Sequence, residues 1–220
     1  MLSVPADENA KGSGATRATA GRQPVIGLIG GIGSGKSAVA RILGDLGAAV
    51  IDSDRLGHEE INRHEVRDEF VRWWGPSVLA ADGSVDRAKV AAIVFADAEE
   101  RRRLESLLHP RIDARRVEIM RGLRGDPSVR MIVLDTPLLL EAKVDRHCDV
   151  IIFVDASWDR RLERSEMARN WPKGELKRRE NLQMPLDAKR SRADYICENN
   201  STFDDLRNQL RRIVASIVAD

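Results

Sequence analysis

Short apolar runs recur along the chain, separated by longer segments that have a helical period. Such runs, rich in valine and isoleucine and bounded by glycine or aspartate, are typical of strands that are buried on both faces of a parallel sheet. We therefore expect strands at VIGLI (25–29), AAVID (48–52), MIVLD (131–135), VIIFVD (150–155) and DYIC (194–197).

The segment after the first strand predicts a helix. Val39, Ile42, Leu43 and Leu46 recur at the spacing of one helix face, and Gly47 follows as the expected C-cap. An apolar strand and an amphipathic helix are therefore expected on either side of the glycine-rich segment between them.

Residues 58–124 are predicted to be mostly helical and to form an insertion between the second and third strands. Asp97 and Glu100 have the form of a capping box that opens a helix. Pro110, preceded by His109, is expected to end this helix, because proline lacks an N–H donor and clashes with the preceding turn. A lone histidine at such a place is more often a cap or a hydrogen-bonding core residue than a catalyst.

The remaining segments complete an α/β pattern. Residues 158–182 are predicted to be helical and strongly charged, and 203–218 to form an amphipathic closing helix. Strands that alternate with helices predict a parallel sheet with helices on both faces. Residues 1–23 have no hydrophobic period and are expected to form a flexible tail, ahead of one domain at 24–220.

The composition excludes several classes of protein. The formal net charge is only +1, from 36 basic and 35 acidic residues, which argues against a dedicated nucleic-acid binder. Cys148 and Cys197 lie in no metal-like spacing, so buried free thiols and a cytoplasmic location are expected. No apolar stretch has the length of a membrane span, so no membrane partner is expected.

The segment GGIGSGKS (30–37) matches the phosphate-loop pattern G-x-x-x-x-G-K-[ST]. Glycines let successive backbone N–H groups surround phosphate oxygens, and the helix that follows adds a partial positive charge. In this motif Lys36 reaches the β- and γ-phosphates of ATP, and the Ser37 hydroxyl holds Mg²⁺. The expected nucleotide-binding residues are Gly31, Ile32, Gly33, Ser34, Gly35, Lys36, Ser37 and Ala38.

Two carboxylates, Asp52 and Asp54, follow the second strand at positions i and i+2. At the carboxyl end of a strand beside the phosphate loop they would face the nucleotide crevice. One could orient Mg²⁺-bound water while the other accepts a proton from an acceptor hydroxyl. The alternative interpretation is a solvated turn, a position that aspartate also favours.

The third strand is followed by the segment DTPLLLE (135–141). Asp135 resembles the acid of a Walker B segment and is expected either to lie near Mg²⁺ or to cap a turn. The apolar residues Pro137, Leu138 and Leu139 could line a pocket for the phosphoryl acceptor.

A basic segment at 160–192 holds eleven Arg and Lys residues against five Asp and Glu. Kinases of small molecules need cations that close over the transferred phosphoryl group. Arg164, Arg169 and Arg179 are candidates for such a lid, although most of these side chains are expected to form a solvated helix face.

The absence of N-K-x-D and LSGGQ segments from the sequence argues against a GTPase and a transporter ATPase. Two alternative functions stay open. One is a P-loop kinase of a nucleoside or a similar alcohol, and the other is a regulatory protein that senses ATP without turnover. The pair of aspartates favours an enzyme, because a sensor needs no base beside the γ-phosphate.

The chain resembles the dephospho-coenzyme A kinase family over nearly all of 25–200. The elements that carry the resemblance are IGLIGGIGSGKS, VIDSD, the run from DGSVDR to IVF (82–95), LLHPRI, DTPLLLE and QMPLDAKRSRADYICEN. The resemblance implies a P-loop kinase fold with a helical coenzyme A-binding insertion at about 53–124 and a helical lid at about 160–182. It implies transfer of the ATP γ-phosphoryl to the ribose 3′-hydroxyl of dephospho-coenzyme A.

The resemblance also implies roles for individual residues. Asp54 would be the general base, Lys36 and the lid residues Arg169 and Arg179 would stabilise the transferred phosphoryl, and Asn199 would lie near the adenine. The expected partners are the small molecules ATP and dephospho-coenzyme A, with no nucleic acid, and the chain is expected to be a monomer or weak homo-oligomer. The acceptor-binding residues would be Asp54, Arg87, His109, Pro137, Leu138 and Leu139, and the Mg²⁺-binding residues Ser37 and Asp52.

The sequence departs from the family pattern at a few positions. Ala38 replaces a frequent threonine after the phosphate loop, and Ser53 replaces an alanine between the two aspartates. Arg161 stands where glutamine is usual, and Glu198 and Ser201 replace an aspartate and a glycine around Asn199.

Overall fold

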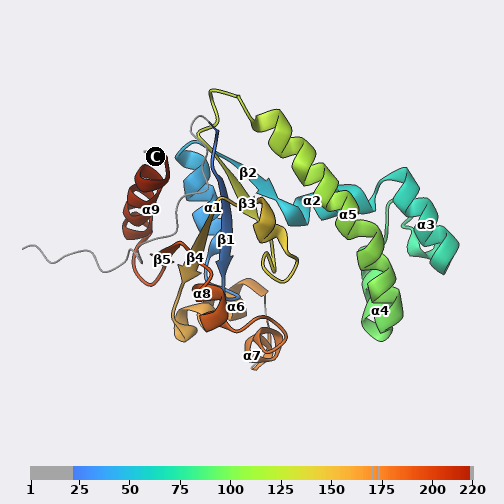
Figure 1. Ribbon diagram of the computed structural model, residues 1–220. Helices are drawn as coiled ribbons and strands as arrows, with labels where there is room; N and C mark the ends of the chain where they lie inside the picture. Colours follow the sequence, from blue (N-terminus) through green and yellow to red (C-terminus); the bar gives the residue numbers. More distant parts are fainter. Residues whose placement is uncertain (1–21, 170, 173, 219–220) are drawn as a thin grey trace, which may run out of the picture. The chain divides into compact units, whose positions relative to one another are not determined.

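A five-stranded sheet forms the centre of the computed structural model, which describes residues 22–169, 171–172 and 174–218. Within this part of the chain the strand order is β2-β3-β1-β4-β5, and β1 pairs in parallel with both β3 and β4 (Figure 1). All the predicted strands are confirmed, as β1 (Val25–Gly30), β2 (Ala48–Asp52), β3 (Met131–Asp135), β4 (Val150–Asp155) and β5 (Tyr195–Glu198).

Strand β1 occupies the middle of the sheet because it is apolar on both sides. In the register, Val25 lies opposite Ile132 on β3, and Gly27 lies opposite Ile151 on β4. Every residue of β1 is buried. The carboxyl end of this central strand therefore leads directly into the glycine-rich loop.

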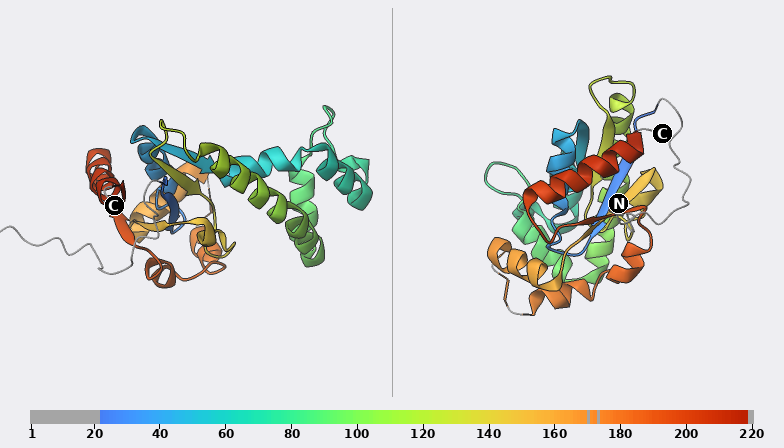
Figure 2. Two further views of the ribbon diagram at one scale, coloured as in Figure 1. Left: turned by 45° about the horizontal axis from the view of Figure 1, so that its top comes forward. Right: turned by 90° about the vertical axis from the view of Figure 1, so that its left-hand side faces the viewer.

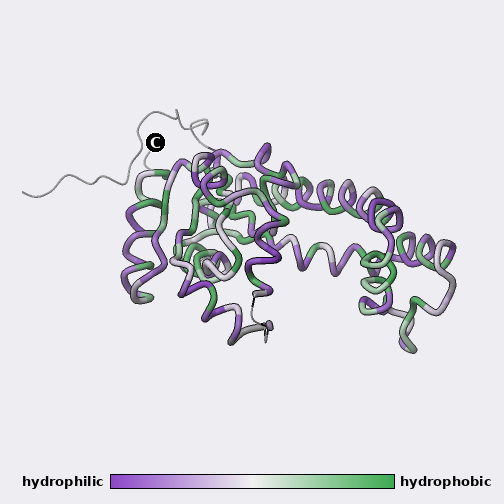
Figure 3. The backbone as a smooth tube through the Cα atoms, turned by 90° about the horizontal axis from the view of Figure 1, so that it is seen from below, coloured by the Kyte–Doolittle hydropathy of each residue, from purple (hydrophilic) through white to green (hydrophobic). Residues whose placement is uncertain are grey.

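Two helices, α1 (Lys36–Asp45) and α9 (Phe203–Val218), cover one face of the sheet. Figure 2 shows α9 lying across this face, and in Figure 3 hydrophilic and hydrophobic positions alternate along it. Both predicted helices are confirmed, and Gly47 follows α1 with a φ of 96°. The buried core here includes Ile26, Leu28, Ile42, Leu43, Met131, Val133, Ile152, Val154, Leu206, Leu210 and Val214.

The opposite face is packed closely by the segment that follows β3. A Cβ atom on Gly27 would lie 2.6 Å from Cys148 Sγ and 3.1 Å from Leu139 Cδ1, so no larger residue fits at this position of β1. Cys148 and Cys197 are both buried thiols that form no disulfide, as the sequence predicts.

The helices between β4 and β5 gather at the carboxyl end of the sheet (Figure 1). They are α6 (Trp158–Arg169), α7 (Glu175–Glu180) and α8 (Leu186–Arg190). This end of the sheet also carries the loop between β1 and α1, so α6, α7 and α8 are the elements available to shape a site there.

The chain divides into two compact units, one with the sheet and one formed by residues 52–122. The second unit contains α2 (Ser53–Ile61), α3 (His64–Trp74), η1 (Pro76–Val78), α4 (Arg87–Ala96) and most of α5 (Ala98–Leu123), in agreement with the predicted helical character. Its own core holds Ile61, Val66, Phe70, Val78, Val85 and Val90, with Trp73 and Trp74 packed against them.

The prediction that Pro110 ends a helix is wrong. Helix α5 begins after Asp97, whose carboxylate caps the N–H of Glu99 at 2.7 Å, and it continues through Pro110 to Leu123. The residues beyond the proline are held by buried side chains, since Arg116 and Met120 are 3% and 4% exposed. Packing of this face outweighs the roughly 3 kcal/mol that an internal proline costs a helix.

Of the expected tail at 1–23, only Arg22 and Gln23 are among the described residues. Residues 1–21 lie outside the described residues, but Arg22 forms an ion pair with Asp149, and Gln23 donates a hydrogen bond to the carbonyl of Asp126 at 3.2 Å. Ordered contacts with the sheet-containing unit are therefore already present at Arg22.

A search of the described helices finds none with both the length and the apolar character needed to cross a bilayer.

Candidate active site

The glycine-rich loop connects β1 to α1 and has a backbone that only glycine adopts readily. Gly33 and Gly35 have φ angles of 74° and 97°. A Cβ atom on Gly33 would lie 2.6 Å from the carbonyl oxygen of Arg161, and one on Gly35 would lie 2.2 Å from Asn199 Nδ2. Arg161 and Asn199 therefore pack against the outer side of the loop. This packing favours a backbone conformation in which the peptide N–H groups form a concavity that binds anions.

Lys36 and Ser37 open helix α1 directly after the loop. The ammonium of Lys36 reaches back and donates to the carbonyls of Gly30 and Gly31, at 3.2 and 3.0 Å. The Ser37 side chain is exposed. The first N–H groups of a helix carry partial positive charge, so this arrangement places a cation and a helix N-terminus at one loop.

Arg164 and Asn199 hold the outer side of the loop. Arg164 donates to the carbonyl of Ser34 at 3.2 Å and to that of Asn199 at 3.0 Å. The Asn199 amide donates to the same Ser34 carbonyl at 2.8 Å, and Asn199 is 7% exposed. The structure therefore directs Asn199 and Arg164, which sequence reasoning had linked to adenine and to the lid, towards the phosphate loop itself.

Arg161 and Glu180 form a buried ion pair between α6 and the end of α7. Arg161 also donates from Nε to the carbonyl of Ala156 at 3.1 Å, and a Cβ atom on Gly31 would lie 2.7 Å from its Nη1. Sequence reasoning noted Arg161 only as a departure from the family pattern. Its 19-residue separation from Glu180 matches no helical or strand period, so no local signal marked the pair.

The other two arginines predicted to act in the lid are Arg169 and Arg179. Arg169 is the last residue of α6, but its side chain lies outside what the structure describes. Arg179 donates to Glu175 at 2.6 Å and stacks 4.5 Å from the ring centroid of Trp171. Hydrogen bonds from Arg178 and then Arg179 lower the pKa of the Glu175 carboxyl to about 2, so these guanidinium groups stay paired at neutral pH.

The structure separates the three apolar residues predicted to line an acceptor pocket. Leu139 is 2% exposed and belongs to the buried core. Leu138 is 43% exposed and has a φ of 54°, while Pro137 is also exposed. A leucine in the left-handed region is uncommon, and such strain occurs often at functional positions.

In the second unit, Asp52 and Asp54 differ in their contacts. Asp52 caps α2, because its Oδ1 accepts from the N–H groups of Asp54 and Arg55 at 2.9 and 3.1 Å. Asp52 is thus an exposed residue at a strand-to-helix turn, where it forms the N-cap of α2. Asp54 lies exposed in the first turn, and within the described part of the chain its carboxylate accepts no hydrogen bond or ion pair.

Arg87 and His109 also lie in the second unit. Arg87 is the first residue of α4, which Asp86 caps, and His109 lies inside α5; both are exposed. His109 therefore does not end a helix, and its side chain remains available at the surface.

The donor set of the site suits a metal held mainly by its substrate. The described residues contain no group of three or more His, Cys, Asp or Glu that could hold a metal ion. Mg²⁺ in phosphoryl-transfer sites is commonly bound through substrate phosphates and waters with one or two protein oxygens. The exposed hydroxyl of Ser37 beside the loop fits that pattern.

Comparison with known proteins identifies the family of this chain. The family described as "Dephospho-CoA kinase" matches residues 24–205, which include every strand of the sheet. This chain belongs to the dephospho-CoA kinase family. A dephospho-CoA kinase of Symbiobacterium thermophilum is 41% identical over 194 residues, which are 84% of this chain and 78% of that protein.

Two solved structures have the same fold as this chain. A crystal structure from Thermus thermophilus superimposes with a TM-score of 0.74 at 31% identity, covering 88% of this chain and 97% of that one. A dephospho-CoA kinase from Campylobacter jejuni gives 0.64 at 23% identity, covering 90% and 99% of the two chains. The predicted P-loop kinase fold is confirmed.

Proposed function

We propose that this protein transfers the γ-phosphoryl group of ATP to the ribose 3′-hydroxyl of dephospho-coenzyme A, giving coenzyme A and ADP. The observation that carries the proposal is the complete phosphate loop, with Lys36 folded over it, in a chain that matches the family over residues 24–205. The loop provides a site for the ATP phosphates, and membership of the family indicates dephospho-coenzyme A as the acceptor.

The phosphate loop would act by positioning and by charge. Negative charge on the transferred group and the β-phosphate is stabilised by fixed N–H dipoles and by a nearby cation, which reorganise little during the reaction. Lys36 already lies across the loop, so a small rotation of its side chain would exchange the carbonyls of Gly30 and Gly31 for phosphate oxygens. Arg164 and Asn199 keep the loop in shape from outside.

Ser37 would hold Mg²⁺ through its hydroxyl, and Asp52 would contribute through a bound water. When bound, the ion supplies positive charge to the β- and γ-phosphate oxygens. Asp52 fits this role only in part, because Oδ1 already caps α2, so Oδ2 is the oxygen that we assign to the metal's water.

Asp54 would act as the general base for the acceptor hydroxyl. A base needs an accessible carboxylate that is not already engaged with a cation, and Asp54 meets both conditions within the described residues. Its fixed position in the first turn of α2 comes from the N-cap that Asp52 provides. We propose Arg87 and His109, both exposed in the second unit, as further contacts for the acceptor.

Leu138 would be the main apolar contact for the acceptor in the loop after β3, with Pro137 beside it. Both are exposed, whereas Leu139 is needed in the core. We further propose that Arg169 and Arg179 approach the phosphoryl group when the segment from α6 to α7 closes over ATP, which requires Arg179 to leave Glu175. We also propose that the protein is located in the cytoplasm and is a monomer or a weak homo-oligomer.

Measuring ADP release with and without dephospho-coenzyme A tests the proposal, with adenosine as a comparison acceptor and the product identified by mass spectrometry. Release should depend on dephospho-coenzyme A, and Asp54→Asn should lower kcat by roughly 10²–10⁴-fold while the fold is kept. Adenosine should be a much poorer acceptor, because the remote parts of the substrate help to hold the hydroxyl in line. Equal use of adenosine would refute the acceptor, and full activity of Asp54→Asn would refute the base.

A further inference from the structure

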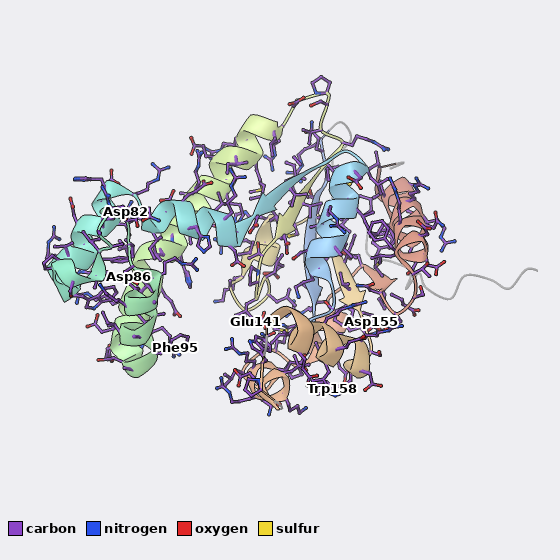
Figure 4. The ribbon with its side chains drawn as sticks, turned by 180° about the vertical axis from the view of Figure 1, so that it is seen from behind. Asp82, Asp86, Phe95, Glu141, Asp155 and Trp158 are labelled. Carbon is purple, nitrogen blue, oxygen red and sulfur yellow. The ribbon has the colours of Figure 1, made fainter. Side chains whose placement is uncertain are left out.

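A partly buried ion pair joins the loop after β3 to helix α8. Lys189 Nζ lies 2.9 Å from Glu141 Oε1, and the two side chains are only 5% and 25% exposed. The same oxygen accepts the N–H of Met184 at 3.0 Å, and Lys189 also donates to Gln183 Oε1 at 3.1 Å. Figure 4 labels Glu141 at the end of the sheet where the helices between β4 and β5 gather.

This pair is poorly explained by stability alone. A buried ion pair often contributes little net stability, because desolvation offsets the attraction of the charges. The second carboxylate oxygen, Glu141 Oε2, is buried and has no hydrogen-bond partner among the described residues, which adds a further penalty. An apolar contact at this place would stabilise the fold more, so the charged residues Glu141 and Lys189 indicate a role in positioning.

On one side the pair fixes the loop that carries Leu138. The loop is closed by a hydrogen bond from the N–H of Ala142 to the carbonyl of Leu138 at 2.8 Å, one residue beyond Glu141. Leu138 holds its left-handed φ of 54° inside this turn. Strain of this kind persists only where surrounding contacts determine the backbone, and Glu141 supplies such contacts.

On the other side the pair fixes a segment that starts at the phosphate loop. Glu180 pairs with Arg161, whose guanidinium lies against Gly31. Only two residues separate Glu180 from Gln183, and the N–H of Gln183 donates to the carbonyl of Glu180 at 3.0 Å. A short chain of contacts therefore runs from the phosphate loop to the loop after β3, all within the sheet-containing unit.

We propose that Glu141 and Lys189 are positioning residues, which hold the Leu138 loop in fixed relation to the phosphate loop so that the acceptor is placed for transfer. The inference deepens the proposed function and rests on it, since Leu138 is assigned there to the acceptor. Loss of the pair should affect the use of dephospho-coenzyme A much more than the binding of ATP, because Arg164 and Asn199 still hold the phosphate loop by contacts of their own.

The test compares Lys189→Met, Glu141→Gln, the double variant and Lys189→Arg in kcat, in KM for dephospho-coenzyme A and in Kd for ATP. A small misplacement of reacting groups can cost up to about 100-fold, so Lys189→Met should lower kcat/KM for dephospho-coenzyme A by about 10- to 100-fold. Its Kd for ATP should stay within about twofold of the wild-type value. Lys189→Arg should recover most of the loss, and the double variant should be no worse than Lys189→Met, since the two residues act as one unit.

Arg22→Met provides the matched control. It removes the cation from another buried carboxylate, Asp149, which accepts the N–H of Val25 at the opposite end of the strands. This variant should lose thermal stability and keep its KM for dephospho-coenzyme A. If Lys189→Met alone does not fold, the double variant, which leaves no unpaired charge, is compared with the wild type instead.

The outcomes distinguish a failure of the positioning role from a failure of the proposed function. Parallel losses in ATP and acceptor parameters, or a change in melting temperature alone, would overturn the positioning role while coenzyme A formation by the wild type still supports the proposed function. Failure of the wild-type enzyme to phosphorylate dephospho-coenzyme A would instead overturn the proposed function itself.

Discussion

Leu138 allows backbone strain and substrate contact to be tested with one substitution. Replacing it by glycine removes the left-handed strain, worth about 1–2 kcal/mol. The glycine costs about 0.5–1 kcal/mol in chain entropy. Because Leu138 is 43% exposed, its covered part contributes about 1–1.5 kcal/mol of burial that is lost as well. These effects nearly cancel, so we expect a destabilisation of about 0.5 kcal/mol, or about 1–2 °C in melting temperature.

Activity should respond differently from stability. If dephospho-coenzyme A covers the part of Leu138 that is now exposed, the lost contact is worth about 1 kcal/mol, or about a fivefold increase in KM for that substrate. The Kd for ATP should not change. Initial rates at varied acceptor concentration, together with thermal unfolding of the same samples, provide the measurement.

Lys143 supplies the control, because it has nearly the same φ, 56°, and is exposed at the end of the same loop. Lys143→Gly should relieve similar strain without losing buried surface, raising the melting temperature by about 1–4 °C. Its KM for dephospho-coenzyme A should match that of the wild type. An unchanged KM in Leu138→Gly, with stabilities as expected, would refute the assignment of Leu138 to the acceptor.

Three further predictions concern the phosphate loop and the thiols. Gly35→Ala should lower the free energy of unfolding by at least about 2 kcal/mol in thermal denaturation, since its Cβ would lie 2.2 Å from Asn199 Nδ2 at a φ of 97°; a wild-type melting temperature would contradict this packing. Lys36→Ala should lose roughly 10²–10³-fold in kcat, and near-normal turnover by a folded variant would exclude the phosphate-loop mechanism. Burial, then the charge of Glu198, raises the pKa of Cys197 to about 12, so at pH 8 it and buried Cys148 should react with a thiol reagent only after unfolding. Stability should also fall as pH rises above the ordinary thiol pKa of 9.0, where only the unfolded chain ionises.

The sequence was most informative where local pattern and chemistry coincide. The phosphate loop needs glycines at fixed positions between a strand and a helix, and β1, α1 and the loop agree with that pattern closely. The buried strands were equally clear, because Met131–Asp135 and Val150–Asp155 are continuous apolar runs that end in an acid. The polar residue at such a strand end marks where chemistry can occur, although not what each carboxylate contacts.

The contacts that the sequence did not reveal are long-range or depend on competition between forces. Arg164 contacts a loop carbonyl 130 residues away, and Asn199 one 165 residues away, so neither contact leaves a periodic signal. Leu138 and Leu139 are the same residue type in one run, and only the turn decides which enters the core. Helix α5 continues past Pro110 because buried side chains beyond it compensate the proline, a balance that a local rule does not contain.

The central position of β1 has a consequence for how the chain is made. On the ribosome, β1 is synthesised long before its neighbours, because its partners on β3 and β4 begin at Met131 and Val150. At about 5–20 residues per second, β1 waits roughly 5–25 s with both edges unpaired, an interval in which an apolar strand is exposed to aggregation. Residues 52–122 emerge in that interval and make contacts mainly among themselves. The nascent chain should therefore depend most on chaperones after this helical unit has folded and before β4 has emerged, which ribosome-arrested chains of increasing length could show.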